Sequence, residues 1–284
     1  MDDLPLTEHD HDQPSAFSPE ALISAVRSLR ALPSVRVPDV VVLEFDGDLY
    51  DALARCGRAQ PWPTWACFHT PMMSVLVDGE PCGIVPRTIG GPFATLVAEQ
   101  LFASGARVVL GLTSAGRVRA DHRLPHFVVV DEAIRDEGTS LHYLPPSRTV
   151  RGHRALNDAL AREIGALALP CHRGLAWSTD APYRETASLL RRRAAEGALA
   201  VEMQAASLFA FAEAKKVDVG VVAYVTNAVD DKEAAPGADK EAAPGADKEA
   251  APFDKGPEGL EEELLLAMCR AAQRYLQASP RGER

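Results

Sequence analysis

The sequence has few of the features that mark secreted, membrane-spanning or nucleic-acid-binding proteins. Its five cysteines (Cys56, Cys67, Cys82, Cys171 and Cys269) are odd in number, scattered and never in a C-x-x-C pair, which argues against a disulfide framework or a zinc site. No apolar run approaches the roughly 20 residues that cross a bilayer. The 30 Lys and Arg residues face 40 Asp and Glu residues, giving a net charge of −10, whereas nucleic-acid binding needs a basic face. We therefore expect neither a membrane nor a nucleic acid as partner.

The first residues also lack a targeting signal. Residues 1–10 are acidic and contain neither the basic region nor the apolar stretch of a secretory signal. We expect residues 1–17 to form a disordered leader, the protein to be cytoplasmic and its thiols to stay reduced.

What the sequence does contain is a long alternation of two hydrophobic periods. Its 284 residues suffice for a sizeable core, with 46% hydrophobic and 25% charged residues. Short β-branched runs predict strands at 40–45, 74–77, 82–85, 107–112, 127–130, 199–201 and 217–225. Amphipathic spacing predicts helices at 19–32, 49–56, 92–104, 155–167, 184–196, 203–215 and 259–276. Strands that alternate with helices predict an α/β fold with helices on both faces of one sheet, formed by residues 18–284.

One internal repeat interrupts this pattern. The octapeptide that starts at Asp231 recurs from Asp239 and, shortened, from Asp247. A Pro-Gly pair in the unit breaks any helix, and no residue is apolar enough to pack. We expect residues 231–252 to be a low-complexity loop insertion.

Two glycine-containing segments are candidates for anion binding. Gly111-Leu-Thr-Ser-Ala-Gly116 follows an apolar strand and is predicted to be a turn, which can offer N–H groups and hydroxyls to an anion. Gly90 and Gly91 precede Pro92 at the start of a helix, where free N–H groups face outward, and Arg87 lies beside them in the sequence. The alternative for residues 111–116 is a turn between a strand and a loop with no ligand, and the alternative for Arg87 is an ordinary surface arginine.

Polar residues at strand ends are the other candidates. Glu202 and Gln204 follow one predicted strand and Asn227 follows another, and open α/β sheets bind ligands at such edges. Helix capping is the alternative role. His122 and His126 have the spacing of two metal ligands on a helix, but Pro125 lies between them and no third ligand is apparent, so we expect no metal site.

Five segments, in order, resemble the nucleoside phosphorylase family that includes uridine phosphorylase, hexameric purine nucleoside phosphorylase and methylthioadenosine nucleosidase. They are residues 89–95, residues 111–116, Ile134-Arg-Asp-Glu-Gly-Thr-Ser-Leu-His-Tyr143, Ser178-Thr-Asp-Ala-Pro-Tyr183 and Val201-Glu-Met-Gln-Ala-Ala206. The similarity runs from about Val40 to Leu276. It implies a single domain whose central, mixed and twisted sheet is flanked by helices.

The resemblance also implies a reaction, in which inorganic phosphate attacks C1′ of a nucleoside and releases a free base and a pentose 1-phosphate. Phosphate is then a co-substrate, and no cofactor or metal is needed. The implied roles are phosphate binding by Arg87, Gly91, Thr113 and Ser114, ribose binding by Met203 and Gln204, and base binding by Tyr183, Arg184 and Asn227, with Asn227 also catalytic. A homo-oligomer is implied too, either a dimer or a hexamer of dimers.

Three departures from the family pattern leave the reaction open. Gly111 stands where relatives have a phosphate-binding Arg, Asp51 stands at the Arg of the G-D-P-x-R segment, and Gln204 replaces a Glu. A purine nucleoside is the favoured substrate. The alternatives are a phosphate-independent nucleoside hydrolase, a uridine phosphorylase-like enzyme and a non-catalytic nucleoside-binding relative.

Overall fold

A single mixed sheet organises the chain. The computed structural model describes residues 5–229 and 255–278, so the octapeptide repeat at 231–252 lies outside the described residues. The strand order is β10-β6-β8-β9-β5-β1-β4-β3-β2, with β7 paired to β6. Because β10 also pairs with β5, the strands β5, β10, β6, β8 and β9 follow one another in a closed circuit, and β1 to β4 extend it from β5. The expected α/β fold with a mixed central sheet is confirmed.

The strands are β1 (Val40–Glu44), β2 (Gln60–Pro61), β3 (Met73–Val77), β4 (Glu80–Pro86), β5 (Val108–Arg117), β6 (His126–Asp136), β7 (Thr149–Arg151), β8 (Cys171–Thr179), β9 (Ala198–Glu202) and β10 (Asp218–Ala228). The helices are α1 (Pro19–Leu29), α2 (Asp48–Arg55), α3 (Gly91–Ala103), α4 (Arg154–Ile164), α5 (Ala187–Ala195), α6 (Ala205–Lys215) and α7 (Leu260–Ala278). Three short 3-10 helices are η1 (Pro5–Thr7), η2 (Thr139–His142) and η3 (Pro182–Arg184).

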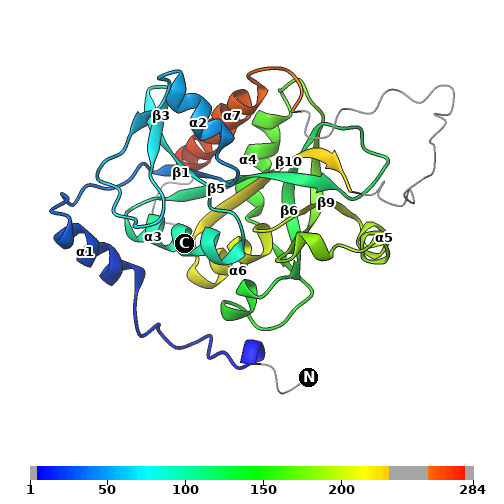
Figure 1. Cartoon of the computed structure of the whole chain (residues 1–284), viewed down its shortest axis with the longest axis horizontal. Helices are drawn as coiled ribbons and strands as arrows, with labels where there is room; N and C mark the ends of the chain where they lie inside the picture. The colour runs from blue at the N-terminus through cyan, green and yellow to red at the C-terminus, as the bar shows by residue number, and fades with distance from the viewer. Residues whose placement is uncertain (1–4, 230–254, 279–284) are drawn as a thin grey trace.

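Helices cover both faces of the sheet. In Figure 1, α2, α4 and α7 gather on one side and α3 and α6 on the other, and α1 lies at the edge beside α3. The burial of β1 explains why its sequence is apolar without a break. Val40 and Val42 face the α2–α4–α7 side, whereas Val41, Leu43 and Phe45 face the α3–α6 side. A strand that is buried on both faces needs apolar residues at every position.

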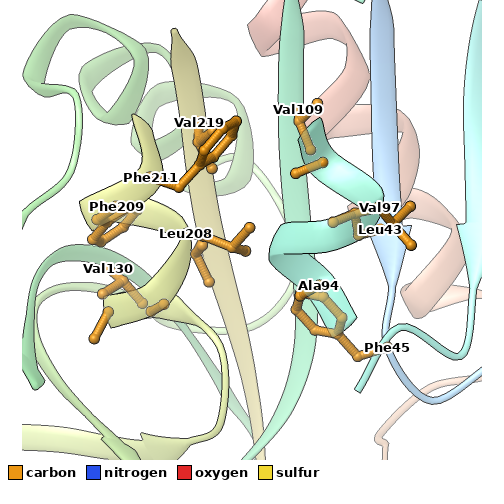
Figure 2. Close-up of a cluster of buried hydrophobic side chains, with 14 of the residues drawn as sticks. Leu43, Phe45, Ala94, Val97, Val109, Val130, Leu208, Phe209, Phe211 and Val219 are labelled. Carbon is orange, nitrogen blue, oxygen red and sulfur yellow. The ribbon is translucent and has the colours of Figure 1, made fainter. Parts of the chain in front are cut away.

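Aromatic side chains pack between the sheet and the two helices on the α3–α6 side. Figure 2 shows Phe209 and Phe211 of α6 packed beside Leu208 and Val219, with Phe45 under Ala94 of α3. Both α3 and α6 are therefore fixed to the sheet by apolar contacts. Their N-terminal ends lie where the strands end, which is where the candidate residues occur.

Several boundaries differ from the sequence predictions. The segment Gly111–Gly116 is not a turn, because β5 continues through it to Arg117 and pairs with both β9 and β10. Strand β8 was absent from the prediction, and β6 extends six residues beyond the predicted end at Val130, to Asp136. The helix predicted to start at Arg184 begins at Ala187, where Thr186 caps it by accepting a hydrogen bond from the Leu189 N–H.

The described part of the leader lies against η2. His11 Nε2 is 3.0 Å from the Leu141 carbonyl oxygen, and the His9 and His142 ring centroids are 4.0 Å apart. Among the helices in the described ranges, none has the length and apolar character to cross a membrane.

Candidate active site

A cavity of about 310 Å³ opens where β5, β9 and β10 end. The strand pairing brings the three ends together, since Gly116 of β5 is opposite both Val201 of β9 and Asn227 of β10. Its lining residues are Phe45, Asp46, Ile89, Thr113, Ser114, Ala115, Gly116, Pro182, Tyr183, Glu185, Val201, Glu202, Met203, Gln204, Asn227 and Val229. Six of the predicted site residues therefore meet in one pocket: Thr113, Ser114, Tyr183, Met203, Gln204 and Asn227.

Glu202 anchors the start of α6. One carboxylate oxygen accepts hydrogen bonds from the N–H groups of Gln204 (2.6 Å) and Ala205 (2.8 Å), and the other accepts one from the Ser178 hydroxyl. Free N–H groups at a helix N-terminus favour such an acceptor. Burial outweighs these hydrogen bonds and raises the pKa of Glu202 from its usual 4.5 to about 7. The capping role left open by the sequence is therefore real for Glu202.

The Gln204 amide has a defined orientation. Its Oε1 atom is 3.1 Å from the Met203 backbone nitrogen and 3.3 Å from the Thr113 hydroxyl. A backbone N–H can only donate, so the atom that faces it must be the amide oxygen. The NH2 group of Gln204 is thereby turned away from that backbone amide, and the side chain presents a donor where a glutamate would present an acceptor.

The predicted phosphate-binding hydroxyls have nearby acceptors of their own. Ser114 Oγ donates to Asp46 Oδ1 at 3.0 Å, and Thr113 Oγ1 lies 2.8 Å from the Ser114 carbonyl oxygen. Asp46 stands just beyond the end of β1. The turn after it is held by Glu44, whose carboxylate accepts hydrogen bonds from the N–H groups of Gly47 (2.8 Å) and Tyr50 (3.3 Å). Burial raises the pKa of Glu44 to about 7.

The charges that line the pocket are negative. Asp46, Glu185 and Glu202 line it, and within the described part of the chain no Lys, Arg or His does. Arg87, predicted to bind phosphate, instead forms an ion pair with Asp51 and packs its side chain against Gly47. Its side chain is 53% exposed and is not part of the lining.

Two further predicted residues are placed outside the lining. Gly91 is buried as the first residue of α3, against Ser207 of α6: a β-carbon on Gly91 would be 2.2 Å from Ser207 Oγ. Arg184 is exposed on η3, next to Tyr183, which is fully exposed at the pocket mouth. The structure thus brings Gly91 and Arg184 near the site without bringing them into it.

Asp46, Phe45 and Glu185 line the pocket but were not among the predicted site residues. Asp46 directly follows a strand that is parallel to its neighbours, so its position at the sheet edge was a usable signal. The sequence gives no indication that Phe45 lines the pocket, because its position depends on packing against Gly111.

A histidine cluster lies near the start of β6. A third histidine, His172, lies beside His122 and His126, with its ring centroid 4.2 Å from that of His122 and 5.2 Å from that of His126. Burial lowers the pKa of His126 to about 4. Even so, the described residues contain no group of three or more His, Cys, Asp or Glu side chains arranged to hold a metal ion.

Comparison with known proteins identifies the family of this chain. Residues 17–253 match the model of the phosphorylase superfamily. The chain therefore belongs to the phosphorylase superfamily, and the resemblance seen in its five sequence segments is confirmed.

The similar curated proteins act on different nucleosides, to judge by their names. Guanosine phosphorylase of Halorubrum lacusprofundi is 31% identical over 152 residues, which are 52% of this chain and 61% of the relative. Uridine phosphorylases of Klebsiella aerogenes and Escherichia coli are 24% and 23% identical over 163 residues, which are 52% of this chain and 64% of each relative. The match thus spans less than two thirds of these relatives.

Proposed function

We propose that this protein cleaves the N-glycosidic bond of a nucleoside and transfers the pentose to inorganic phosphate. The observation that carries the proposal is the meeting of Thr113, Ser114, Gln204 and Asn227 in one cavity, in a chain of the phosphorylase superfamily. Its volume of about 310 Å³ falls at the lower end of small-molecule pockets.

The proposed roles follow from position in the pocket. Thr113 and Ser114 on β5 bind phosphate, Met203 and Gln204 at the start of α6 hold the pentose, and Asn227 at the end of β10 hydrogen-bonds the base. Cleavage of this bond passes through a cation-like sugar, which nearby negative charge stabilises. The Asn227 amide can donate and accept at once, which suits the O6 and N1–H edge of a 6-oxopurine.

The fully exposed Tyr183 could stack on a base at the pocket mouth, with Arg184 beside it. Arg87 and Gly91 reach a phosphate only if their surroundings rearrange. We further propose that the protein is a cytoplasmic homo-oligomer built from dimers that needs no cofactor besides phosphate; light scattering of the purified chain tests the oligomer.

A second candidate function is hydrolysis of the same bond by water. It is favoured by the carboxylates of Asp46 and Glu185 and by the absence of a cation in the described lining, since phosphate is an anion.

One experiment separates these functions. Inosine, guanosine, adenosine, uridine and methylthioadenosine are each incubated with the protein, with and without phosphate, and free base is followed by chromatography. Phosphate-dependent release establishes a phosphorylase, and equal release without phosphate establishes a hydrolase. Binding without release identifies a non-catalytic relative.

A further inference from the structure

At the expected phosphate end of the pocket, the side chains of Asp46, Ser114 and Thr113 present acceptors rather than donors. Asp46 Oδ1 and the Ser114 carbonyl oxygen can only accept, so the hydroxyls of Ser114 (3.0 Å) and Thr113 (2.8 Å) must be the donors in these two contacts. Each hydroxyl has one proton, and both protons are already engaged. Among these three side chains, the lone pairs of both hydroxyls and the Asp46 carboxylate remain able to bind a ligand.

These side chains weaken the binding of phosphate at Thr113 and Ser114 and let a water molecule compete for the same place. A phosphate dianion offers oxygens and negative charge, which meet the like charge of Asp46. A water molecule offers two protons, and a carboxylate together with a hydroxyl oxygen can accept both. Neither neighbouring cation lines the cavity. Arg87 is paired with Asp51, and Lys255, which also interacts electrostatically with Asp46, lies 3.0 Å from Glu261 and 3.7 Å from Asp48.

We propose that Asp46 determines which nucleophile the pocket accepts, by weakening the binding of phosphate and by holding a water molecule for attack on the pentose. This inference rests on the proposed cleavage of a nucleoside. Asp46 is half-buried and lines the cavity, so its carboxylate can touch the nucleophile directly.

The hydrolytic step balances with groups that are present. The water oxygen forms a bond to C1′ while the C1′–N bond breaks, and the electron pair of that bond leaves with the base. Asp46 accepts the proton that the water loses and later returns it to solvent, and the departing base takes up a proton from solvent. The products are a free pentose and a free base.

The test compares Asp46→Asn with the wild-type protein and with Asp48→Asn. The first substitution keeps the size of the side chain and an oxygen for the Ser114 hydroxyl but removes the charge. Asp48→Asn removes the same charge two residues away, from a side chain that is 79% exposed and outside the pocket lining. Guanosine and inosine are the substrates, and free pentose and pentose 1-phosphate are quantified separately over a series of phosphate concentrations.

In the wild-type protein we expect free pentose to form without phosphate. In Asp46→Asn we expect the rate of free-pentose formation to fall at least about tenfold. We also expect the phosphate concentration for half-maximal phosphorolysis to fall about tenfold. That change corresponds to the repulsion between a dianion and a single charge about 5 Å apart in a water-like medium. Asp48→Asn should match the wild type in the rate of free-pentose formation and in the phosphate concentration for half-maximal phosphorolysis. Wild-type values in Asp46→Asn, or the same shift in Asp48→Asn, overturn the proposal.

Direct binding of inorganic phosphate keeps this inference separate from the proposed function. If no nucleoside is cleaved by the wild-type protein, the proposed function fails, and calorimetric titration of all three proteins with phosphate still decides the role of Asp46. Tighter binding of phosphate by Asp46→Asn alone supports the proposed role of Asp46. Equal or undetectable binding of phosphate by all three proteins overturns that role. If Asp46→Asn does not fold, Ser114→Ala takes its place. This substitution removes the hydrogen bond that orients Asp46, so we expect slower phosphate-independent hydrolysis and no increase in the affinity for phosphate. Unchanged hydrolysis overturns the proposal.

Discussion

The ring of Phe45 lies against Gly111, with its Cζ atom 3.0 Å from the place where a β-carbon of residue 111 would be. Phe45 also lines the pocket and belongs to the core on the α3–α6 side. The ring of Phe45 thus covers residue 111, the position at which the family resemblance implies an arginine. Any side chain at residue 111 has to compete with the Phe45 ring for this space.

This arrangement predicts the effect of Gly111→Ala. The added methyl group meets the Phe45 ring at 3.0 Å and the Val221 side chain at 3.3 Å, so both must shift. We expect the free energy of unfolding to fall by about 1–3 kcal/mol, the usual cost of overpacking a core. Denaturant unfolding measures it, and Phe45→Leu in the same chain should recover part of the loss. Unchanged stability would show that the ring is not held against Gly111.

The buried Glu202 predicts a pH dependence of stability. Its pKa is raised from 4.5 to about 7, so between these values the folded protein holds a proton that the unfolded chain has released. Stability therefore falls as pH rises from about 4.5 to about 7, by on the order of 3 kcal/mol for this group. Glu44 adds a change of the same sign over the same range.

Glu202→Gln isolates the contribution of Glu202. The amide oxygen can accept from the N–H groups of Gln204 and Ala205, and the NH2 group can donate to Ser178, so its partners are kept. Unfolding free energies measured from pH 4.5 to pH 7 should fall less steeply than in the wild-type protein. Parallel curves for the two proteins contradict a raised pKa at Glu202. In Glu44→Gln, by contrast, one of the two backbone N–H groups loses its acceptor, and we expect lower stability at every pH.

The amide of Gln204 predicts weak discrimination between sugars. A neutral hydrogen bond contributes about 0.5–1.5 kcal/mol and one to a charged group about 1.5–3 kcal/mol. We therefore expect kcat/KM for inosine and 2′-deoxyinosine to differ by about tenfold or less in the wild-type protein. Gln204→Glu should widen that ratio, because a carboxylate oxygen can face the sugar while the other keeps the Met203 N–H. A ratio that is unchanged by the substitution would place the pentose hydroxyls elsewhere.

The sequence predicted the fold well where hydrophobic periodicity is regular. β1, β10, α3 and α6 occur close to the predicted positions, because each is apolar over most of its length. The predicted strand at 107–112 ends before the observed end of β5 at Arg117, because Gly111, Ser114 and Gly116 are residue types typical of turns. In the structure Gly111 makes room for Phe45, and Gly116 makes room for Val229 and Val201, with a β-carbon site only 2.7 Å from Val229 Cγ1.

The site residues that could be predicted are those next to apolar runs. Thr113, Gln204 and Asn227 could be identified because they end or follow apolar runs. Asp46 was overlooked because Asp-Gly-Asp reads as a turn signal. His172 joins His122 and His126 only through the parallel pairing of β6 with β8, where Val128 is opposite His172, and a pairing between distant strands is not visible in local sequence.

The central claim is that this pocket cleaves the N-glycosidic bond of a nucleoside. The most direct measurement is the release of free base from inosine, guanosine, adenosine, uridine and methylthioadenosine in the presence of phosphate, followed by chromatography with an Asn227→Ala protein as the matched control. We expect release from a purine nucleoside before uridine, with a much lower rate in Asn227→Ala. No release from any of the five, or equal release by Asn227→Ala, would contradict it.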